Sequence, residues 1–532
     1  MPSTKKLLSI TNLKKYFPIA KSSIFQRQQY YVKANEDISL DIYEGETLGI
    51  VGESGCGKST LGRVLLQLYE QTAGTTMYYG MSRAELAPRY VTDTLRHAKR
   101  YISKLHAAQA RADAASAKVS QLGEAATFFD LQNKNLAVAE YQTAQAHIAK
   151  ILGGFLVQDT EQGAALLYRK ARLEERAAAL SDRIRDIELM LDESEGGTAD
   201  DGKPANASQL ARLKGRCDRL TRERDGLNAQ IREAEQSIAA IKQAHRDDPE
   251  FQRYEAMLDD GIDLARLKYS EMRILRKDLQ IIFQDPYSSL NPRFTIGQII
   301  EEGLVTHKFF RHGSPKMREH VVRTMKECGL QEYMLFRYPH QFSGGQRQRI
   351  SIARALAVHP KFVVCDECVS ALDVSIQSQI INLLQELKQK EHLTYMFISH
   401  DLSVVRYISD RICVMYLGNV VELADAATVF GDPRHPYTVA LLSSIPTTDM
   451  ESLKKERILL EGSIPSPVKP PDGCKFHTRC WMACDKCRRV PPPLAEIEPG
   501  HFVACHFPER KLDENGNYLF EMPKTEKKSA KE

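Results

Sequence analysis

The stretch that decides the fold of this chain is Gly52-Glu53-Ser54-Gly55-Cys56-Gly57-Lys58-Ser59. It follows the apolar run of residues 47–51 and reads G-x-x-x-x-G-K-S, the pattern of a phosphate-binding loop between a strand and a helix. The glycines allow backbone N–H groups to turn toward phosphates, and the next helix points its positive end at them. Lys58 is expected on the β- and γ-phosphates, and the Ser59 hydroxyl on Mg²⁺. The expected nucleotide contacts of this loop are Gly52, Ser54, Gly55, Gly57, Lys58, Ser59 and Thr60.

A second apolar run, residues 361–365, ends in the two carboxylates Asp366 and Glu367. A buried strand with this ending places Asp366 beside the Mg²⁺ of the phosphate-binding loop. Glu367 then faces the γ-phosphate and is the candidate general base for an attacking water. The two motifs together predict hydrolysis of a nucleoside triphosphate.

The composition excludes several classes of protein. The formal net charge of +4 is small for 532 residues, so we expect no nucleic-acid partner. No apolar run approaches the ~20 residues of a membrane span, and residues 1–10 lack the apolar core of a secretory signal. We therefore expect the chain in the cytosol, where a cluster among its 11 cysteines indicates a metal rather than disulfides.

Changes in composition divide the chain into four segments. Residues 1–86 and 268–445 alternate β-rich runs with helical stretches, the pattern of an α/β fold. Residues 87–267 are rich in Ala, Leu, Arg and Glu, and residues 446–532 begin as a Pro- and Cys-rich stretch and end as a charged tail. We therefore expect one α/β domain with a helical insertion and a small C-terminal extension.

The insertion has apolar residues at alternating spacings of three and four, the heptad pattern of coiled-coil helices. One series is Leu173, Ala177, Leu180, Ile184, Ile187 and Leu191. The other is Leu210, Leu213, Cys217, Leu220, Leu227, Ile231, Ala234, Ile238 and Ile241. Residues 192–208 between them are acidic and Gly-rich, so an antiparallel helical hairpin is predicted. A further helical stretch, residues 92–152, has an apolar stripe that ends at Leu122.

The third motif is Phe342-Ser343-Gly344-Gly345-Gln346, just before a helical stretch. Here the chain resembles the ATP-binding-cassette ATPases, whose signature reads L-S-G-G-Q. The resemblance implies a P-loop NTPase cassette with a RecA-like core, an antiparallel β subdomain and an α-helical signature subdomain. It also implies that Ser343, Gly344, Gly345 and Gln346 contact ATP held by a second subunit, so that two subunits enclose ATP head to tail.

Further positions match the same family one by one. Gln284 resembles the glutamine that senses Mg²⁺ and the membrane partner, and Asp373 ends the loop that touches the other subunit's site. His400 resembles the switch histidine that holds the γ-phosphate and the water. Phe17, with Tyr16 as the alternative, is placed where an aromatic ring stacks on adenine. In one departure, Cys368 follows Glu367 where family members usually have Pro.

Three longer stretches resemble the oligopeptide and dipeptide (peptide/nickel) importers within this family. They are residues 283–293 (FQDPYSSLNPR), 435–438 (HPYT) and 460–467 (LEGSIPSP). This resemblance implies ATP and Mg²⁺ as cofactors, a companion ATPase subunit that makes a hetero-dimer, two membrane permeases and an extracytoplasmic substrate-binding protein. It also implies a peripheral position on the cytoplasmic face of the membrane.

The cysteines of the extension form a second candidate site. Cys474, Cys480, Cys487 and Cys505 are spaced x5, x6 and x17, with Cys484 in addition. Four thiolates suit either tetrahedral Zn²⁺ or a [4Fe–4S] cluster, and the spacing does not choose between them. The resemblance to the peptide importers favours the iron–sulfur cluster.

A different class also combines a P-loop with heptads: the coiled-coil ATPases of DNA maintenance and repair. In those families the coil follows the glutamine that corresponds to Gln284 and is far longer, whereas here the insertion precedes Gln284. The small net charge also disfavours DNA. The sequence therefore favours the importer ATPase.

Overall fold

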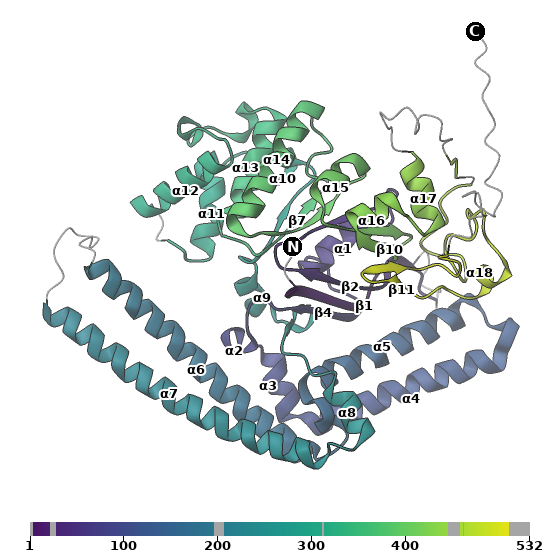
Figure 1. Ribbon diagram of the computed structural model, residues 1–532, viewed down its shortest axis with the longest axis horizontal. Coiled ribbons are helices and arrows are strands. Elements are labelled where there is room, and N and C mark those ends of the chain that lie inside the picture. The colour runs from purple at the N-terminus through teal and green to yellow at the C-terminus, as the bar shows by residue number, and fades with distance from the viewer. Residues whose placement is uncertain are drawn as a thin grey trace, which may run out of the picture. The chain divides into compact units, whose positions relative to one another are not determined.

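The protein is described here by a computed structural model (Figure 1). The described residues are 4–21, 28–195, 207–310, 313–444, 458–460 and 462–509. The chain divides into two compact units, the first made of Met1–Thr76 and Arg273–Glu532 and the second of Met77–Met272. None of the described helices is long and apolar enough to cross a membrane.

The first unit is built on an eight-stranded sheet. Its strand order is β11 (Ala495–Glu498), β12 (His501–Val503), β10 (Asn419–Asp425), β9 (Arg411–Tyr416), β3 (Thr47–Val51), β8 (Thr394–Ile398), β7 (Phe362–Asp366) and β6 (Leu279–Ile282). The five strands from β9 to β6 are parallel, and β3, β7 and β8 are buried along their whole length. Strands that are covered on both faces consist of continuous apolar runs. The apolar run of residues 47–51 therefore predicted the bounds of β3 correctly.

Antiparallel pairs occur in both sheets that the described residues form. In the eight-stranded sheet, β10 pairs with β9 and β12, and β11 pairs with β12. A four-stranded sheet has the order β2 (Tyr31–Tyr43), β1 (Lys6–Pro18), β4 (Ala73–Tyr78) and β5 (Ile262–Asp263). In the second unit, the last residues of β4 pair with β5, Met77 opposite Asp263 and Tyr78 opposite Ile262.

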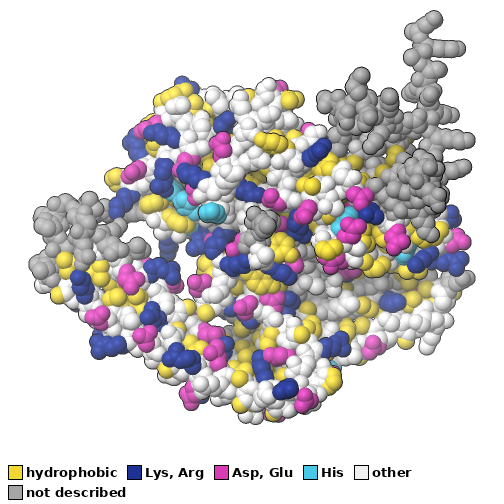
Figure 2. Space-filling model, viewed as in Figure 1, with side chains coloured by type: hydrophobic (Ala, Val, Ile, Leu, Met, Phe, Trp, Pro, Cys, Tyr) yellow, Lys and Arg dark blue, Asp and Glu magenta, His cyan; other side chains and the backbone are white. Residues whose placement is uncertain are grey.

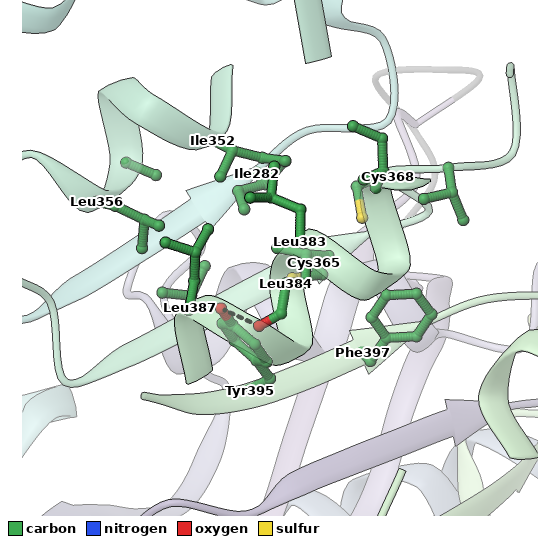
Figure 3. Close-up of a cluster of buried hydrophobic side chains, with 14 of the residues drawn as sticks. Ile282, Ile352, Leu356, Cys365, Cys368, Leu383, Leu384, Leu387, Tyr395 and Phe397 are labelled. Atoms are coloured by element: carbon green, nitrogen blue, oxygen red, sulfur yellow. Dashed lines mark hydrogen bonds between the residues drawn. The ribbon is translucent and has the colours of Figure 1, made fainter. Parts of the chain in front are cut away.

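Helices α13 (Gly344–Leu356) and α14 (Val374–Glu391) pack on β6, β7 and β8 through an apolar core (Figure 3). Ile352 from α13 and Leu384 from α14 are fully buried there. The Tyr395 hydroxyl from β8 donates a hydrogen bond to the Leu384 carbonyl oxygen at 3.2 Å, so the buried phenol is satisfied. The remaining helices of this unit are α1 (Lys58–Leu65), α10 (Pro286–Ser289), α11 (Ile296–Thr306), α12 (Pro315–Glu327), α15 (Leu402–Ile408), α16 (Ala426–Gly431), α17 (Pro436–Ser443) and α18 (Asp485–Arg489).

The second unit is almost entirely helical (Figure 1). Its helices are α2 (Arg83–Leu86), α3 (Arg89–Arg96), α4 (Ala98–Leu122), α5 (Phe128–Leu152), α6 (Thr160–Glu195), α7 (Ala207–Ala244) and α8 (Pro249–Glu255), and α9 (Tyr269–Leu275) follows β5 across the boundary of the units. The predicted single stretch 92–152 is thus broken, with Gly123 at a φ of 51° where α4 ends. Leu122, expected in the apolar stripe, is 37% exposed because it is the last residue of α4.

Helices α6 and α7 lie antiparallel, since Lys170 near the start of α6 forms an ion pair with Glu235 near the end of α7 at 2.9 Å. All the heptad residues of the first series, and those of the second series between residues 213 and 231, join one apolar cluster, including Leu180 and Leu227. A second cluster centres on Phe155 and Phe251, whose rings meet edge to face at 5.8 Å. Of the predicted loop 192–208, residues 196–206 lie outside the described residues.

Positive and negative side chains are interspersed on the face of the molecule shown in Figure 2. This distribution agrees with the formal net charge of +4.

Candidate active site

The phosphate-binding loop follows β3 and ends where α1 begins at Lys58. Gly52 and Gly57 have φ values of 148° and 101°, a region that L side chains rarely adopt. A Cβ atom on Gly57 would lie 2.1 Å from the Ala34 carbonyl oxygen, so the close backbone approach also requires glycine. Ser54 and Gly55 form the exposed tip of the loop, and Thr60 is half-buried on α1.

The Lys58 side chain lies inside this loop. Its ammonium donates to the carbonyl oxygens of Gly52 at 2.7 Å and Glu53 at 3.1 Å, and the residue is 5% exposed. These bonds place a buried positive charge beside the start of α1, where the helix dipole is also positive. The arrangement fits the binding of a polyanionic phosphate chain.

The expected Mg²⁺ ligands of the loop and of β7 are brought together. The Ser59 hydroxyl donates to Oδ1 of Asp366 at 2.5 Å, although the two residues are 307 positions apart. Arg63 of α1 approaches the other carboxylate oxygen at 3.5 Å. Asp366 is 2% exposed at the end of β7. A hydroxyl and a buried carboxylate are oxygen ligands of the kind that Mg²⁺ prefers, so the pair fits the ion.

The three neighbouring strands β6, β7 and β8 deliver the other predicted groups to one edge of the sheet. Gln284, Glu367 and His400 each come one or two residues after the end of their strand. Gln284 Nε2 donates to Oε2 of Glu367 at 2.8 Å, and His400 Nδ1 lies 3.6 Å from the same oxygen. Because the strands are parallel, their carboxyl ends meet here.

Glu367 has a left-handed backbone with a φ of 49°. Its N–H donates to the Ile398 carbonyl at 3.0 Å, and its carbonyl accepts from the Ser370 hydroxyl at 2.9 Å. A non-glycine residue in this region is strained, and surrounding bonds must hold it there. Strained residues of this kind cluster at active sites, ligand clamps and switch regions.

The signature residues lie at the start of α13. Ser343 caps this helix, since its hydroxyl accepts from the Gln346 N–H, and the Gln346 side chain accepts from the Ser343 N–H in return. Ser343 and Gly344 are exposed, and Gly345 and Gln346 are half-buried. Asp373 is exposed at the N-cap of α14, with no capping bond from its side chain. The exposed helix start suits a phosphate from another subunit.

The structure distinguishes the two candidate adenine platforms. Tyr16 is 5% exposed, and its hydroxyl donates to Glu36. Phe17 is half-buried in β1 and meets the Tyr69 ring edge to face at 5.4 Å, with the Lys15 ammonium 4.6 Å from its centroid. Phe17 therefore has the more accessible ring.

Two cysteines of the extension belong to α18, Cys484 as its N-cap and Cys487 within it, and the Cys474 N–H donates to the Cys487 carbonyl at 2.8 Å. Cys484 and Cys487 have their sulfurs 3.7 Å apart, and burial raises the pKa of Cys480 to about 12 and of Cys505 to about 11, with nearby thiols adding to both shifts. Cys474 also contributes to both shifts, so these thiols lie in one neighbourhood. Among the described residues, however, no three His, Cys, Asp or Glu side chains are arranged to hold a metal ion. The iron–sulfur or zinc site stays a prediction.

Two side chains that the sequence did not single out for the site hold the phosphate-binding loop. The guanidinium of Arg479 pairs with both carboxylate oxygens of Glu53, at 2.8 and 3.0 Å. The Tyr437 hydroxyl accepts a bond from the Glu53 N–H at 2.8 Å. Tyr437 belongs to the motif at residues 435–438, and Arg479 precedes Cys480. The sequence around neither residue indicates a contact with a residue 380 or more positions earlier in the chain.

The fold and the site together define a P-loop ATPase of the cassette type. Two family models match the chain, "ABC transporter" over residues 35–161 and 253–370 and "Oligopeptide/dipeptide transporter, C-terminal region" over residues 421–487. A putative oligopeptide transport ATP-binding protein of Bacillus subtilis, YkfD, is 53% identical over 248 residues, which are 46% of this chain and 75% of that protein. The oligopeptide transport ATP-binding protein AppF of the same organism is 52% identical over 254 residues, 47% of this chain and 76% of that one.

The chain belongs to the ATP-hydrolysing subunits of ABC transporters, in the group of oligopeptide/dipeptide transporters. ATP and Mg²⁺ are the cofactors of this family. The alternative of a DNA-maintenance ATPase receives no support from these matches. The family match is interrupted at residues 162–252, which lie in the second unit.

Proposed function

We propose that the chain powers the import of oligopeptides or dipeptides through a pair of membrane permeases. The observation that carries the proposal is identity of 52–53% to oligopeptide transport ATP-binding proteins, over three quarters of their length. The match at residues 421–487 to the C-terminal region of oligopeptide/dipeptide transporters supports the same solute class.

In this proposal the chain binds ATP together with a companion ATPase subunit, head to tail. Lys58 neutralises the phosphates. Ser59, Gln284 and Asp366 would hold Mg²⁺, which would supply positive charge against the phosphate oxygens. Glu367 accepts the proton of the attacking water, and His400 holds the water and γ-phosphate in line. The remaining contacts are Phe17 on adenine, residues 52–60 on the phosphates, and Ser343, Gly344, Gly345, Gln346 and Asp373 on the companion's site.

The proposed partners are the companion ATPase, two permeases and an extracytoplasmic substrate-binding protein, and the proposed place is the cytoplasmic face of the membrane. The test is affinity purification of Glu367→Gln from detergent-solubilised membranes with ATP, followed by mass spectrometry. A second cassette ATPase and two multi-span permeases are expected. Recovery of DNA-associated proteins without a permease would overturn the importer.

The solute requires a separate measurement. Cells that lack the chain are complemented with the wild type or with Glu367→Gln, and uptake of a labelled tripeptide and of nickel is followed. Restoration of peptide uptake by the wild type alone supports the proposal. Restoration of nickel uptake without peptide uptake would contradict it.

We also propose that residues 87–267 are a coiled-coil insertion that docks a cytosolic partner or the companion ATPase. The antiparallel packing of α6 and α7, with exposed charges on both helices, supports this role. Excision of about residues 90–265 with a short linker is expected to weaken assembly or regulation. Unchanged transport, assembly and regulation would show that the insertion has no docking role and is only a tolerated addition to the fold.

For residues 446–532 we propose a metal-binding extension with Cys474, Cys480, Cys487 and Cys505 as the ligands. The neighbourhood of these thiols supports the proposal, and residues 445–457, 461 and 510–532 lie outside the described part of the chain. Four thiolates would hold a [4Fe–4S] cluster or Zn²⁺. Anaerobically purified protein is expected to be brown, with about four irons per chain. Colourless protein with one zinc would refute the cluster.

A further inference from the structure

The segment between Cys474 and Cys480 packs against the phosphate-binding loop. Arg479 lies in this segment, and its two terminal nitrogens pair with the two carboxylate oxygens of Glu53. The Arg479 side chain is 6% exposed and that of Glu53 is 25% exposed. This is therefore a bidentate, largely desolvated pair rather than a surface ion pair, and such charge-assisted bonds are among the stronger ones in proteins.

Glu53 is the second residue of the loop, and its backbone is held at both ends. Its N–H donates to the Tyr437 hydroxyl, and its carbonyl oxygen accepts from the Lys58 ammonium at 3.1 Å. The same carbonyl accepts from the Cys56 N–H at 3.3 Å. A rotation of Glu53 therefore moves the carbonyl that positions the phosphate-binding lysine.

The Cys474–Cys480 segment is itself fixed at two further points. Phe476 is 1% exposed, and its ring lies 5.2 Å from that of Tyr416 and 5.5 Å from that of Tyr437. The Lys475 ammonium donates to the Leu417 carbonyl at 2.9 Å. Arg479 therefore projects from a segment whose position is fixed by contacts other than those with the phosphate-binding loop.

We propose that Arg479 is a positioning residue for nucleotide binding. Its bond to the Glu53 carboxylate fixes the first turn of the phosphate-binding loop and, through the Glu53 carbonyl, the place of Lys58. The C-terminal extension thereby sets the affinity of the cassette for nucleotide. This inference rests on the proposed role of residues 52–60 in nucleotide binding.

The test measures the dissociation constant of a fluorescent ATP analogue with Mg²⁺ on the purified full-length chain. Arg479→Gln is expected to raise this constant about tenfold, since hydrogen bonds to charged groups contribute enough for a change of that size. Arg479→Lys is expected to lie between Gln and the wild type, because an ammonium cannot form the two parallel bonds. Arg489→Gln, at an exposed arginine of the same extension, is the control and is expected to bind as the wild type does.

Two comparisons separate positioning from a structural role. The double variant Glu53→Gln/Arg479→Gln is expected to bind no more weakly than the weaker single variant, because both changes remove the same bond. A fall in the unfolding temperature of nucleotide-free Arg479→Gln, with a dissociation constant within twofold of the wild type, would overturn the proposal. Lys58→Ala in the same assay tests the site itself, because retained affinity there would refute the nucleotide site and not only the role of Arg479.

Discussion

The substitution Glu367→Gln separates the chemistry of the site from its architecture. The Glu367 carboxylate is contacted by Gln284 at 2.8 Å and by His400 at 3.6 Å, both on Oε2. A glutamine has the same length and keeps an amide oxygen that accepts from Gln284. It is unbranched at Cβ like glutamate, so the left-handed backbone at φ 49° costs both residues about the same. The geometry should therefore survive, and only the ability to accept a proton is lost.

The magnitude follows from that loss. A positioned general base contributes about 10²- to 10⁴-fold to a rate, so hydrolysis should fall by about that factor. Expressed as an activation barrier, this is about 2.7–5.4 kcal/mol. Binding should change little, since removal of one negative charge beside a triphosphate does not oppose its approach. We expect the dissociation constant for ATP with Mg²⁺ to stay within about threefold.

The assay is phosphate release by the purified transporter complex, with nucleotide binding measured on the same preparation. The control is Glu386→Gln, an exposed carboxylate on α14, which should hydrolyse ATP at the rate of the wild type. A loss of hydrolysis below tenfold would show that Glu367 is not the base. A large loss that is accompanied by a tenfold loss of binding would show that the site had collapsed, and the argument from geometry would be wrong.

Three further substitutions test the loop, the core and a buried charge. Gly57→Ala should abolish nucleotide binding and lower the unfolding temperature, because its Cβ would lie 2.1 Å from a carbonyl oxygen. The control Gly55→Ala places its Cβ in open space and should cost only about 1–2 kcal/mol of backbone strain. Equal effects of the two substitutions would refute the steric argument. Leu384→Ala should lower the free energy of unfolding in urea by about 2–5 kcal/mol, since this fully buried side chain leaves a cavity; a loss under 1 kcal/mol would contradict this. Burial alone would raise the pKa of Glu36, but neighbouring lysines, Lys14 first, lower it from 4.5 to about 2. The ionised carboxylate therefore stabilises the fold above about pH 4.5, and this stabilisation is lost as the pH falls toward 2. In Glu36→Gln the free energy of unfolding should fall less between pH 5 and pH 3 than it does in the wild type. An equal fall in both proteins would count against the buried pairing.

The parts of the site that follow parallel strands were predictable from the sequence. The apolar run of residues 361–365 was long enough to mark a buried strand, and Asp366 and Glu367 come directly after it, whereas His400 was indicated by the family resemblance. Parallel strands bring their carboxyl ends to one edge, so the sequence also indicated which groups would meet. The hydrogen bond between Ser59 and Asp366 is the outcome of that rule across 307 positions.

Other contacts had no local signal. Arg479 and Glu53 are 426 positions apart, and an arginine between two cysteines reads equally well as a solvated residue. The choice between Tyr16 and Phe17 depends on which of the two rings faces the interior from β1. Because the pairing of β1 with β2 has several register shifts, the alternation of apolar and polar residues does not predict which ring this is. Leu122 fitted the apolar stripe, but a spacing rule does not reveal where a helix ends.

The pairing of β4 with β5 has a consequence for how such a chain can change in evolution. Met77 and Tyr78 lie opposite Asp263 and Ile262, so the chain departs and returns through adjacent backbone positions. Loop-closure entropy rises by only about 0.6 kcal/mol for each doubling of loop length, and the helices that follow β4 pack around their own apolar cluster. The paired ends of β4 and β5 are thus a position at which we expect an inserted segment to cost little loop-closure entropy. We expect that a segment inserted there, including a reporter domain, leaves β7 and its carboxylates Asp366 and Glu367 in place.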